Sequence, residues 1–354
     1  MSQGVSFRRV FRRVVVPAAA MLCLAGASVA SGAVVGNGNA PGSVPAHVYA
    51  PYLETWTPAS VLRLARGSGA RYLTLAFLET PSKGSCTPTW DGDPAQTMSA
   101  GRYLWEVKAL RKQMGGDVIP SFGGYSADHT GRELADSCTN LHDLVSAYES
   151  VITTYGVTRL DMDVEDRSLR NSAGIDRRNE ALALVERWAR RHRRPLEISY
   201  TLPSTPAGLV GSGVKVLQSA IAHHARVDVV DIMTFDYYDG TTPDMGAAAI
   251  SAARGLYGQL HDLYPARSPQ QLWAMEGNTI LPGIDDYPKK TEVTYPRDAR
   301  RLLRFAQAHG IGSLSIWAIQ RDNGGCPGWK DQNRCSGIQQ QTWQFSHILE
   351  PFTS

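Results

Sequence analysis

The sequence predicts a single (β/α)8 barrel, an α/β fold in which eight parallel strands alternate with eight helices. Three observations predict it: eight apolar or β-branched runs recur, a stretch with helical spacing lies between each pair, and several helices end at glycine just before the next run. Each run is apolar enough to be buried on both faces, which is typical of parallel sheets. A doubly wound open sheet is the alternative, but no GxGxxG pattern follows the first run.

The predicted strands follow one another without interruption. The first four are contained in VYAPYLETW from Val48, RYLTLAFLET from Arg71, DVIPSFGGYS from Asp117 and TRLDMDVED from Thr158. The last four are contained in LEISYTLPS from Leu196, VDVVDIMTFDYYDG from Val227, QLWAMEGNTILPG from Gln271 and GSLSIWAIQRD from Gly312. Between them, apolar residues are spaced for one helix face, and Gly115, Gly156 and Gly310 stand where helices are expected to end. Because no linker interrupts this pattern, residues 47–354 are predicted to form one domain.

The first thirty residues are typical of a secretory signal peptide. Four arginines between positions 8 and 13 form a basic start, and an apolar stretch from Val14 to Ala27 leads to a small-residue cleavage site at Ser28-Val29-Ala30. A membrane anchor is the alternative, but it needs about 20 apolar residues, and this run is shorter and contains Pro17. We therefore expect a secreted, extracellular protein in which residues 31–46 form a flexible lead-in. Either the Sec or the twin-arginine route fits this start.

The charge balance argues against nucleic acid as a partner. The chain has 36 Lys and Arg against 33 Asp and Glu, and removing residues 1–30 leaves 32 basic residues. A nucleic-acid binder normally keeps a basic excess. The one dense basic run, from Arg187 to Arg194, ends a predicted helix, where cations suit the helix dipole. No later segment is long and apolar enough to span a bilayer, and we expect a monomer.

Four cysteines follow the signal peptide: Cys86, Cys138, Cys326 and Cys335. An even count in an oxidising compartment favours two disulfides, and the close Cys/His pairs that zinc requires are absent. Of the three possible pairings, Cys326 with Cys335 is the natural one because only eight residues separate them, and Cys86 is then left with Cys138. We predict these two disulfides and expect no metal and no cofactor.

The fourth predicted strand carries the strongest functional signal. Asp161, Asp163 and Glu165 share one face because strand side chains alternate in direction, and the apolar residues between them share the other. The apolar face must meet the helices, so the carboxyls are predicted to point into the barrel at the end where barrel enzymes have their active sites. Burial and like-charge repulsion then keep at least one carboxyl protonated, as a general acid requires. A solvated acidic loop or a cation site is the alternative, but a hard cation needs more oxygen ligands at closer spacing.

The pattern Asp161-x-Asp163-x-Glu165 resembles the signature strand of glycoside hydrolase family 18, the chitinase family. Ser121-Phe122-Gly123-Gly124 on the third strand is similar to the family's SxGG, and Met233-Thr234-Phe235-Asp236 on the sixth is similar to its MxYD. Trp317 on the eighth strand lies where the family has a tryptophan beneath the sugar. The resemblance extends over essentially the whole chain after the signal peptide, and it is closest to an actinobacterial secreted branch.

The resemblance implies hydrolysis of β-1,4-linked N-acetylglucosamine polymers, chitin or chito-oligosaccharides, by a retaining, substrate-assisted reaction. Glu165 would protonate the glycosidic oxygen and later act as a base toward water. Asp163 would orient the substrate's acetamido group as its carbonyl attacks the anomeric carbon to form an oxazolinium ion, and Asp161 would share a proton with Asp163. The other implied sugar contacts are Asp236, Tyr237 or Tyr238, Trp317, Met233, Gly123 and Gly124, of which the two glycines have an equal interpretation as turn residues.

The chain departs from the family pattern in two places. Thr158 and Arg159 replace the usual Asp-Gly, and because they lie at the entry of the strand we expect little consequence. Phe235 replaces a tyrosine whose hydroxyl usually steadies the acetamido carbonyl, a loss that can cost a few kcal/mol unless Tyr237 or Tyr238 compensates. The alternatives to a chitinase are an endo-N-acetylglucosaminidase acting on protein glycans and a carbohydrate-binding relative without activity, which the presence of Glu165 disfavours.

The segment after the seventh predicted strand bears on the shape of the substrate groove. The strand is predicted to end near Gly283 and helical spacing resumes at about Tyr295, which leaves only the short stretch IDDYPKKTEVT between them. Some family members insert a small domain here that deepens the groove, but a folded domain needs about 50 residues. We therefore expect a shallow, open groove and endo-type cleavage with low processivity.

Overall fold

The computed structural model of the protein describes residues 43–241, 243–286, 292–329 and 334–353. The predicted signal peptide, residues 1–30, and most of the predicted lead-in lie outside the described residues. The chain divides into the units Met1–Gly36 and Asn37–Ser354, and everything below concerns the second. Within the described ranges, no helix combines the length and the apolar composition that crossing a bilayer would require.

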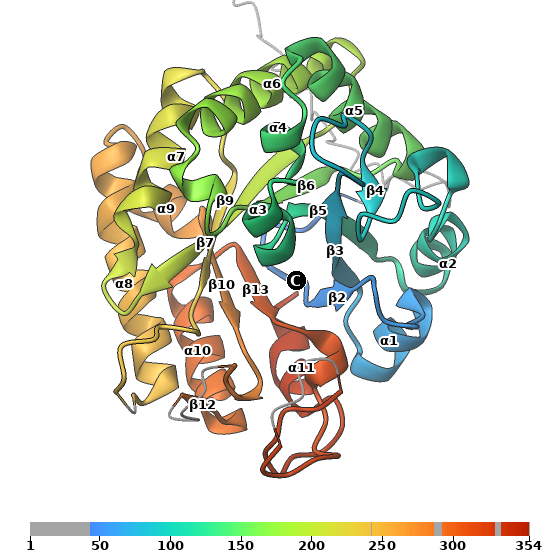
Figure 1. Ribbon diagram of the computed structural model, residues 1–354. Helices are drawn as coiled ribbons and strands as arrows, with labels where there is room; N and C mark the ends of the chain where they lie inside the picture. The colour runs from blue at the N-terminus through green and yellow to red at the C-terminus, as the bar shows by residue number, and fades with distance from the viewer. Residues whose placement is uncertain (1–42, 242, 287–291, 330–333, 354) are drawn as a thin grey trace, which may run out of the picture. The chain divides into compact units, whose positions relative to one another are not determined.

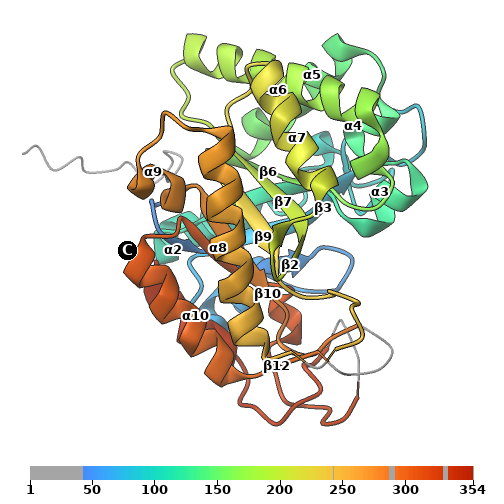
Figure 2. The same cartoon turned by 90° about the vertical axis from the view of Figure 1, so that its left-hand side faces the viewer.

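The strands form the closed parallel ring that the sequence predicts (Figures 1 and 2). Its members are β3 (Tyr72–Glu79), β5 (Asp117–Gly123), β6 (Arg159–Asp163), β7 (Glu197–Thr205), β9 (Val229–Met233), β10 (Glu276–Ile280) and β13 (Ser313–Ile316), with a first strand that is split into β1 (Val48–Tyr49) and β2 (Tyr52–Glu54). β1 pairs with β13 and β2 pairs with β3. The split strand therefore closes the ring and completes an eight-stranded barrel.

Helices surround the ring (Figure 1). The longer ones are α1 (Val61–Ser68), α2 (Leu104–Met114), α5 (Leu141–Tyr155), α6 (Ser172–Arg191), α7 (Gly211–Ala222), α8 (Met245–Leu263) and α10 (Pro296–His309). The shorter ones are α3 (Tyr125–Thr130), α4 (Leu134–Ser137), α9 (Pro269–Ala274) and α11 (Gln344–Leu349), with 3-10 turns η1 (Met98–Ala100), η2 (Ser168–Arg170), η3 (Ile319–Arg321) and η4 (Glu350–Phe352). As predicted, α2, α5 and α10 end at Gly115, Gly156 and Gly310, whose φ angles of 65°, 61° and 73° are left-handed.

One predicted strand begins later than expected. The seventh strand is predicted within the run from Gln271, but the first residues of that run belong to α9, and β10 starts only at Glu276. The Ser268 hydroxyl accepts from the Gln271 N–H, the Gln271 side chain accepts from the Ser268 N–H, and Pro269 occupies the first turn. This capping box starts a helix in spite of the apolar residues that follow.

The apolar core lies between the ring and the helices, whereas the inside of the ring is largely polar. Leu160 and Met162 of β6 belong to the main apolar cluster together with Val151 of α5 and Leu182 of α6. The residues that line the interior cavity include Thr74, Arg159, Asp161, Ser199, Asp231 and Ser313. The alternation predicted for the fourth strand is therefore present, with its apolar side chains toward the helices.

Two short antiparallel additions and one hairpin extend the carboxyl ends of the strands. β4 (Thr89–Trp90) pairs with β3, and β8 (Gly208–Leu209) pairs with the end of β7. β11 (Gly283–Ile284) and β12 (Val293–Thr294) form the hairpin that follows β10. Of the stretch between Gly283 and Tyr295, residues 287–291 lie outside the described residues.

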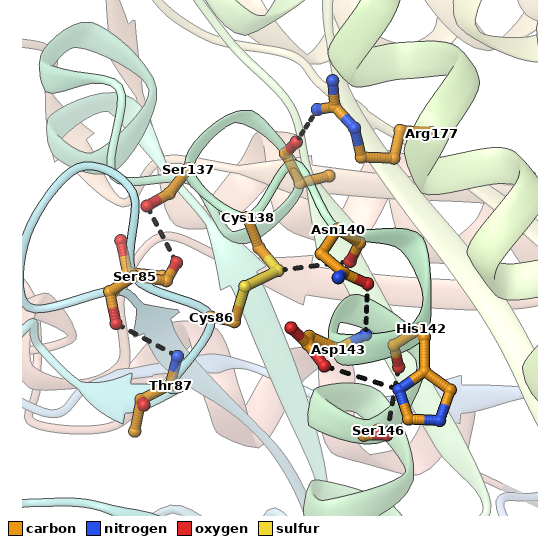
Figure 3. Close-up of a disulfide and its surroundings, with 12 residues drawn as sticks. Ser85, Cys86, Thr87, Ser137, Cys138, Asn140, His142, Asp143, Ser146 and Arg177 are labelled. Carbon is orange, nitrogen blue, oxygen red and sulfur yellow. Dashed lines mark hydrogen bonds and ion pairs between the residues drawn. A yellow bond between two sulfur atoms is a disulfide. The ribbon is translucent and has the colours of Figure 1, made fainter.

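The two disulfides pair the cysteines as the sequence predicts. Cys86, in the loop between β3 and β4, is bonded to Cys138 at the end of α4, with their Cα atoms 4.6 Å apart (Figure 3). Beside this bond, the Ser137 hydroxyl donates to the carbonyl of Ser85 at 3.0 Å. Cys326 is bonded to Cys335 in the loop after η3. The first disulfide therefore ties together two loops at the same end of the barrel as the carboxyl groups of β6.

Candidate active site

Asp161 lies inside the ring and accepts hydrogen bonds from four hydroxyl groups. The hydroxyls of Ser121 and Tyr52 reach Oδ2 at 2.6 and 3.1 Å, and those of Ser199 and Thr201 reach Oδ1 at 2.7 and 3.0 Å. Burial raises the pKa of Asp161, and the four hydrogen bonds act against that rise. The donors come from three other strands, so the ring itself holds this carboxyl as an acceptor.

Asp163 shares the inward face of β6 and lacks such support. Its side chain is 3% exposed, and its Oδ1 has no hydrogen-bond partner among the residues that the structure describes. Burial raises the pKa of Asp163 well above its ordinary range, and the nearby Glu165 and Asp161 raise it further. Of the two buried aspartates, Asp163 is therefore the one whose surroundings favour the neutral form.

Glu165 lies two residues beyond the end of β6 and is partly exposed. Burial raises its pKa to about 7, while a hydrogen bond from the backbone N–H of Tyr125 lowers it and Asp166 raises it again. A carboxyl with a pKa near 7 can give a proton to a leaving group and take one from water at neutral pH. The electrostatics of Glu165 are thus those of a general acid and base.

The turn between β5 and α3 packs directly against the carboxyl-bearing strand. Gly123 and Gly124 have φ angles of 101° and 82°. A Cβ atom on Gly123 would lie 2.0 Å from the carbonyl oxygen of Asp163, and one on Gly124 would lie 2.4 Å from the ring of Phe77. Both glycines are therefore explained by the turn conformation and its close approach to β6 and to Phe77. Their contact with a sugar stays a prediction.

The segment after β9 holds a second acidic group near the site. Burial and a hydrogen bond shared with Asp285 raise the pKa of Asp236 to about 9. The backbone N–H of Asp236 donates to Asp285 at 2.9 Å, and those of Tyr237 and Tyr238 donate to Glu292 at 3.0 and 3.2 Å. Sequence reasoning missed Asp285 and Glu292, although both stand in the short segment that it examined for its length alone.

Aromatic rings line the same end of the barrel. The ring of Trp317 stacks on Phe77 with centroids 5.5 Å apart, and it lies 5.5 Å from Tyr52 and 6.1 Å from Trp56. Trp56 is 39% exposed. Trp317 also packs against an apolar cluster that contains Met233. Sequence reasoning found Trp317 and Met233 and missed Phe77 and Trp56, of which Trp56 could have been found because it directly follows the first strand.

Arg159 lies deeper in the site than expected. It stands at the entry of β6 as predicted, but it is only 4% exposed and it lines the interior cavity together with Asp161 and Asp231. Its guanidinium donates to Glu197 at 2.7 Å, and its positive charge lowers the pKa of Asp231, which burial raises. The expected small consequence of this departure stays a prediction, and the structure adds that Arg159 is a cation close to the buried carboxyl of Asp231.

Several sequence-predicted residues therefore meet at the carboxyl ends of the strands. Within the ranges that the structure covers, no group of three or more His, Cys, Asp or Glu side chains is arranged to hold a metal ion. The side chains present supply a proton donor near neutral pH, buried carboxyls and aromatic faces. This combination suits acid–base cleavage of a bond in a carbohydrate.

Comparison with known proteins places this geometry in a family. No family model matches the chain. Among curated proteins, the chain is 33% identical over 320 residues to the "Probable bifunctional chitinase/lysozyme" of Escherichia coli (strain K12). This match covers 87% of the chain and 35% of that protein. The chain is also 34% identical over 288 residues to "Endochitinase 11" of Metarhizium anisopliae. That match covers 78% of the chain and 53% of the relative. The chain thus spans about a third and about half of the length of these relatives.

A solved structure matches over nearly its whole length. This structure is active domain 2 of the thermostable chitinase from Pyrococcus furiosus, solved as catalytic-site mutants complexed with chito-oligosaccharides. It matches the chain with a TM-score of 0.76 at 31% identity. The match covers 90% of this chain and 97% of that one. The barrel, the carboxyls of β6 and these likenesses together define a glycoside hydrolase. The chain belongs to the chitinase family, glycoside hydrolase family 18.

Proposed function

We propose that the protein is a secreted, monomeric chitinase that cleaves β-1,4-linked N-acetylglucosamine polymers with retention, using the acetamido group of the substrate as nucleophile. The observation that carries this proposal is the difference between Glu165 and Asp163. Glu165 has the pKa of a general acid, whereas Asp163 is buried, favours the neutral form and has an oxygen without a partner among the described residues. A protonated carboxyl cannot attack an anomeric carbon, so the nucleophile has to come from the substrate.

In this reaction Glu165 donates its proton to the glycosidic oxygen as the bond breaks. The acetamido carbonyl attacks the anomeric carbon, and the free Oδ1 of Asp163 accepts the acetamido N–H as positive charge develops. Asp161, held by four hydroxyl donors, takes the greater share of negative charge in the pair. Glu165 then removes a proton from water, which opens the oxazolinium ion and restores the acid.

The remaining site residues would hold the sugar. Trp317 offers a ring face that already stacks on Phe77, and Asp236 has an Oδ1 without a hydrogen-bond partner among the described residues. Phe235 is 8% exposed and packs against Met233, so it offers no hydroxyl to the acetamido carbonyl. Tyr237 is the better substitute because its hydroxyl is buried and makes no hydrogen bond to the described residues.

We further propose endo-type cleavage in an open groove. The chain between β10 and α10 contains only the short hairpin of β11 and β12 and the segment that it encloses. This length cannot supply the folded wall that would deepen a groove, since a domain needs about 50 residues. Mixed-length oligomers in the early products would support the proposal, whereas near-exclusive release of the disaccharide from the start would contradict it.

Export through the predicted signal peptide belongs to the same proposal. Two disulfides support it, because such bonds persist in oxidising compartments. The resemblance of the sequence to an actinobacterial secreted branch points the same way. N-terminal sequencing of protein recovered from a culture medium tests it, and an N-terminus close to residue 31 is the expected result.

The central experiment measures hydrolysis of a chromogenic chito-oligosaccharide beside a high-mannose glycoprotein. We expect cleavage of the first substrate and a loss of about 100- to 10,000-fold in kcat for Glu165→Gln, because the amide keeps the shape but cannot donate a proton. Glu180→Gln, at an exposed position of α6, is the matched control and should retain full activity. Cleavage of the glycoprotein alone would indicate an endo-N-acetylglucosaminidase, and binding without cleavage would indicate a carbohydrate-binding relative.

A further inference from the structure

The start of helix α3 and the glycine before it contact the chain around the catalytic acid, and α3 lies next to the ends of β5 and β6 (Figure 1). The N–H of Gly124 donates to the carbonyl of Asp163 at 3.1 Å. The backbone N–H of Tyr125 lowers the pKa of the Glu165 carboxyl, which burial raises. In the opposite direction, the N–H of Glu165 donates to Oδ2 of Asp128 at 2.5 Å. Asp128 is therefore the residue of α3 whose side chain holds the backbone of Glu165.

The burial of Asp128 is unusual for a residue of a short surface helix. Its side chain is fully buried, and its Oδ1 has no hydrogen-bond partner among the described residues. Burying a carboxyl without full compensation costs free energy, so such a group persists where something else depends on it. Among the described residues, the Asp128 carboxyl accepts its hydrogen bond from the N–H of Glu165.

A buried ion pair lies near the Asp128 carboxyl and acts on its charge. The guanidinium of Arg178, on α6, lies 2.8 Å from Glu133, and both side chains are at most 1% exposed. Burial and the charge of Glu133 raise the pKa of Asp128 well above its ordinary range, while Arg178 and the N–H of Glu165 lower it. The charged groups that face Asp128 from the surrounding elements are Glu133, Asp136, Asp163, Glu165 and Arg178, and Lys83 and Arg167 line the surface cavity beside it.

We propose that Asp128 is a positioning residue, which fixes the main chain at Glu165 so that the catalytic carboxyl stays against the N–H of Tyr125 and in reach of the leaving-group oxygen. The inference rests on the proposed function and goes beyond it, because Asp128 acts on the reaction only through Glu165. Glu165 lies beyond the strand pairing, since β6 ends two residues earlier at Asp163. Its carbonyl accepts from the N–H of Leu169 at 3.1 Å, and Asp128 is the side chain that holds its N–H. A displacement of about 1 Å in a reacting group can cost about 100-fold in rate.

Two substrates that differ in their leaving group can distinguish a residue that positions the acid from one that only stabilises the fold. A sugar leaving group needs its proton from Glu165, whereas 2,4-dinitrophenolate departs without one. We therefore compare chitohexaose with 2,4-dinitrophenyl β-chitobioside, following the burst of dinitrophenolate so that only the first chemical step is read. For Asp128→Ala we expect at least a tenfold loss of kcat on chitohexaose with KM within about twofold, and less than about a threefold loss in the dinitrophenolate burst.

The conservative variant and the controls make the outcome decisive. Asp128→Asn keeps an oxygen that accepts the Glu165 N–H and is neutral, so it should stay within about threefold of the wild type on both substrates. Asp262→Asn, at a surface position with an 87% exposed side chain, is the matched control. If Asp128→Ala does not fold in a thermal unfolding test, Asp128→Ser is measured in its place.

Equal losses on both substrates, or no loss on chitohexaose, would overturn the proposal. Failure of Asp128→Asn to restore the rate would overturn it as well. Glu165→Gln is measured alongside, because it should show the same selectivity with a larger amplitude. If Glu165→Gln still cleaves chitohexaose at the wild-type rate, the proposed function has failed, and that outcome is distinct from a failure of the role assigned to Asp128.

Discussion

Replacing Gly123 by alanine tests whether the turn after β5 determines the position of the carboxyl-bearing strand. The added Cβ would lie 2.0 Å from the Asp163 carbonyl oxygen, at a residue whose φ is 101°. A strained backbone of this kind costs about 1–3 kcal/mol, and forcing a carbon into a packed contact costs about 1–3 kcal/mol more. We therefore expect the free energy of unfolding to fall by about 2–6 kcal/mol.

The effect on catalysis should exceed the effect on stability alone. Relief of the clash moves the Asp163 backbone, and a displacement of about 1 Å near reacting atoms can lower the rate about 100-fold. The assay is thermal unfolding together with kcat on chitohexaose for Gly123→Ala and for Gly258→Ala. Gly258 lies in α8, and a Cβ atom added there would meet no atom within 4 Å, so alanine should be neutral or stabilise by up to about 1 kcal/mol. Equal behaviour of the two variants in both assays would refute the reasoning.

Two further predictions concern pH and the disulfides. The pKa of Glu165 is raised to about 7, and the protonated acid is the active form. We therefore expect kcat/KM to be at its maximum well below pH 7 and to fall about tenfold per pH unit above it. A value that is unchanged up to pH 9 would contradict this. Replacing Cys86 and Cys138 by serine should destabilise the protein more than replacing Cys326 and Cys335. The first disulfide closes the longer loop, because its cysteines are 52 positions apart in the sequence and those of the second are 9 apart. The loop entropy that each disulfide removes from the unfolded chain corresponds to a loss of stability of about 4 kcal/mol for the first pair and about 3 kcal/mol for the second. Urea unfolding measures both losses, and the reverse order would contradict the estimate.

The parts of the fold that could be predicted are those that depend on short stretches of chain. Eight apolar or β-branched runs identified the strands, and Gly115 ends α2 because glycine adopts a left-handed φ at no steric cost. The same locality explains the misplaced start of β10. Leu272 and Trp273 suit a strand as well as a helix, and the capping box at Ser268 decides in favour of the helix.

The parts of the site that could not be predicted come from segments distant in the sequence. Asp128 reaches Glu165 across 37 residues, and Glu292 holds the backbone of Tyr237 across 55 residues. No spacing rule connects such pairs, because the barrel brings the ends of its strands together whatever the lengths of the helices between them. Arg159 illustrates the same limit: strand alternation puts it on the face of Asp161, but only the tertiary structure brings it close to Asp231 of β9.

The sequence by itself determined which side chains of the fourth strand enter the barrel, because the two-residue period of an extended backbone puts Asp161 and Asp163 on one face whatever surrounds them. Only the tertiary structure decided how these two carboxyls differ. Asp161 is surrounded by hydroxyls from neighbouring strands, among them Ser199 at 2.7 Å, whereas an oxygen of Asp163 has no partner among the described residues. The proton affinity of a buried carboxyl depends on the donors and charges around it in space, and only folding brings those groups into place.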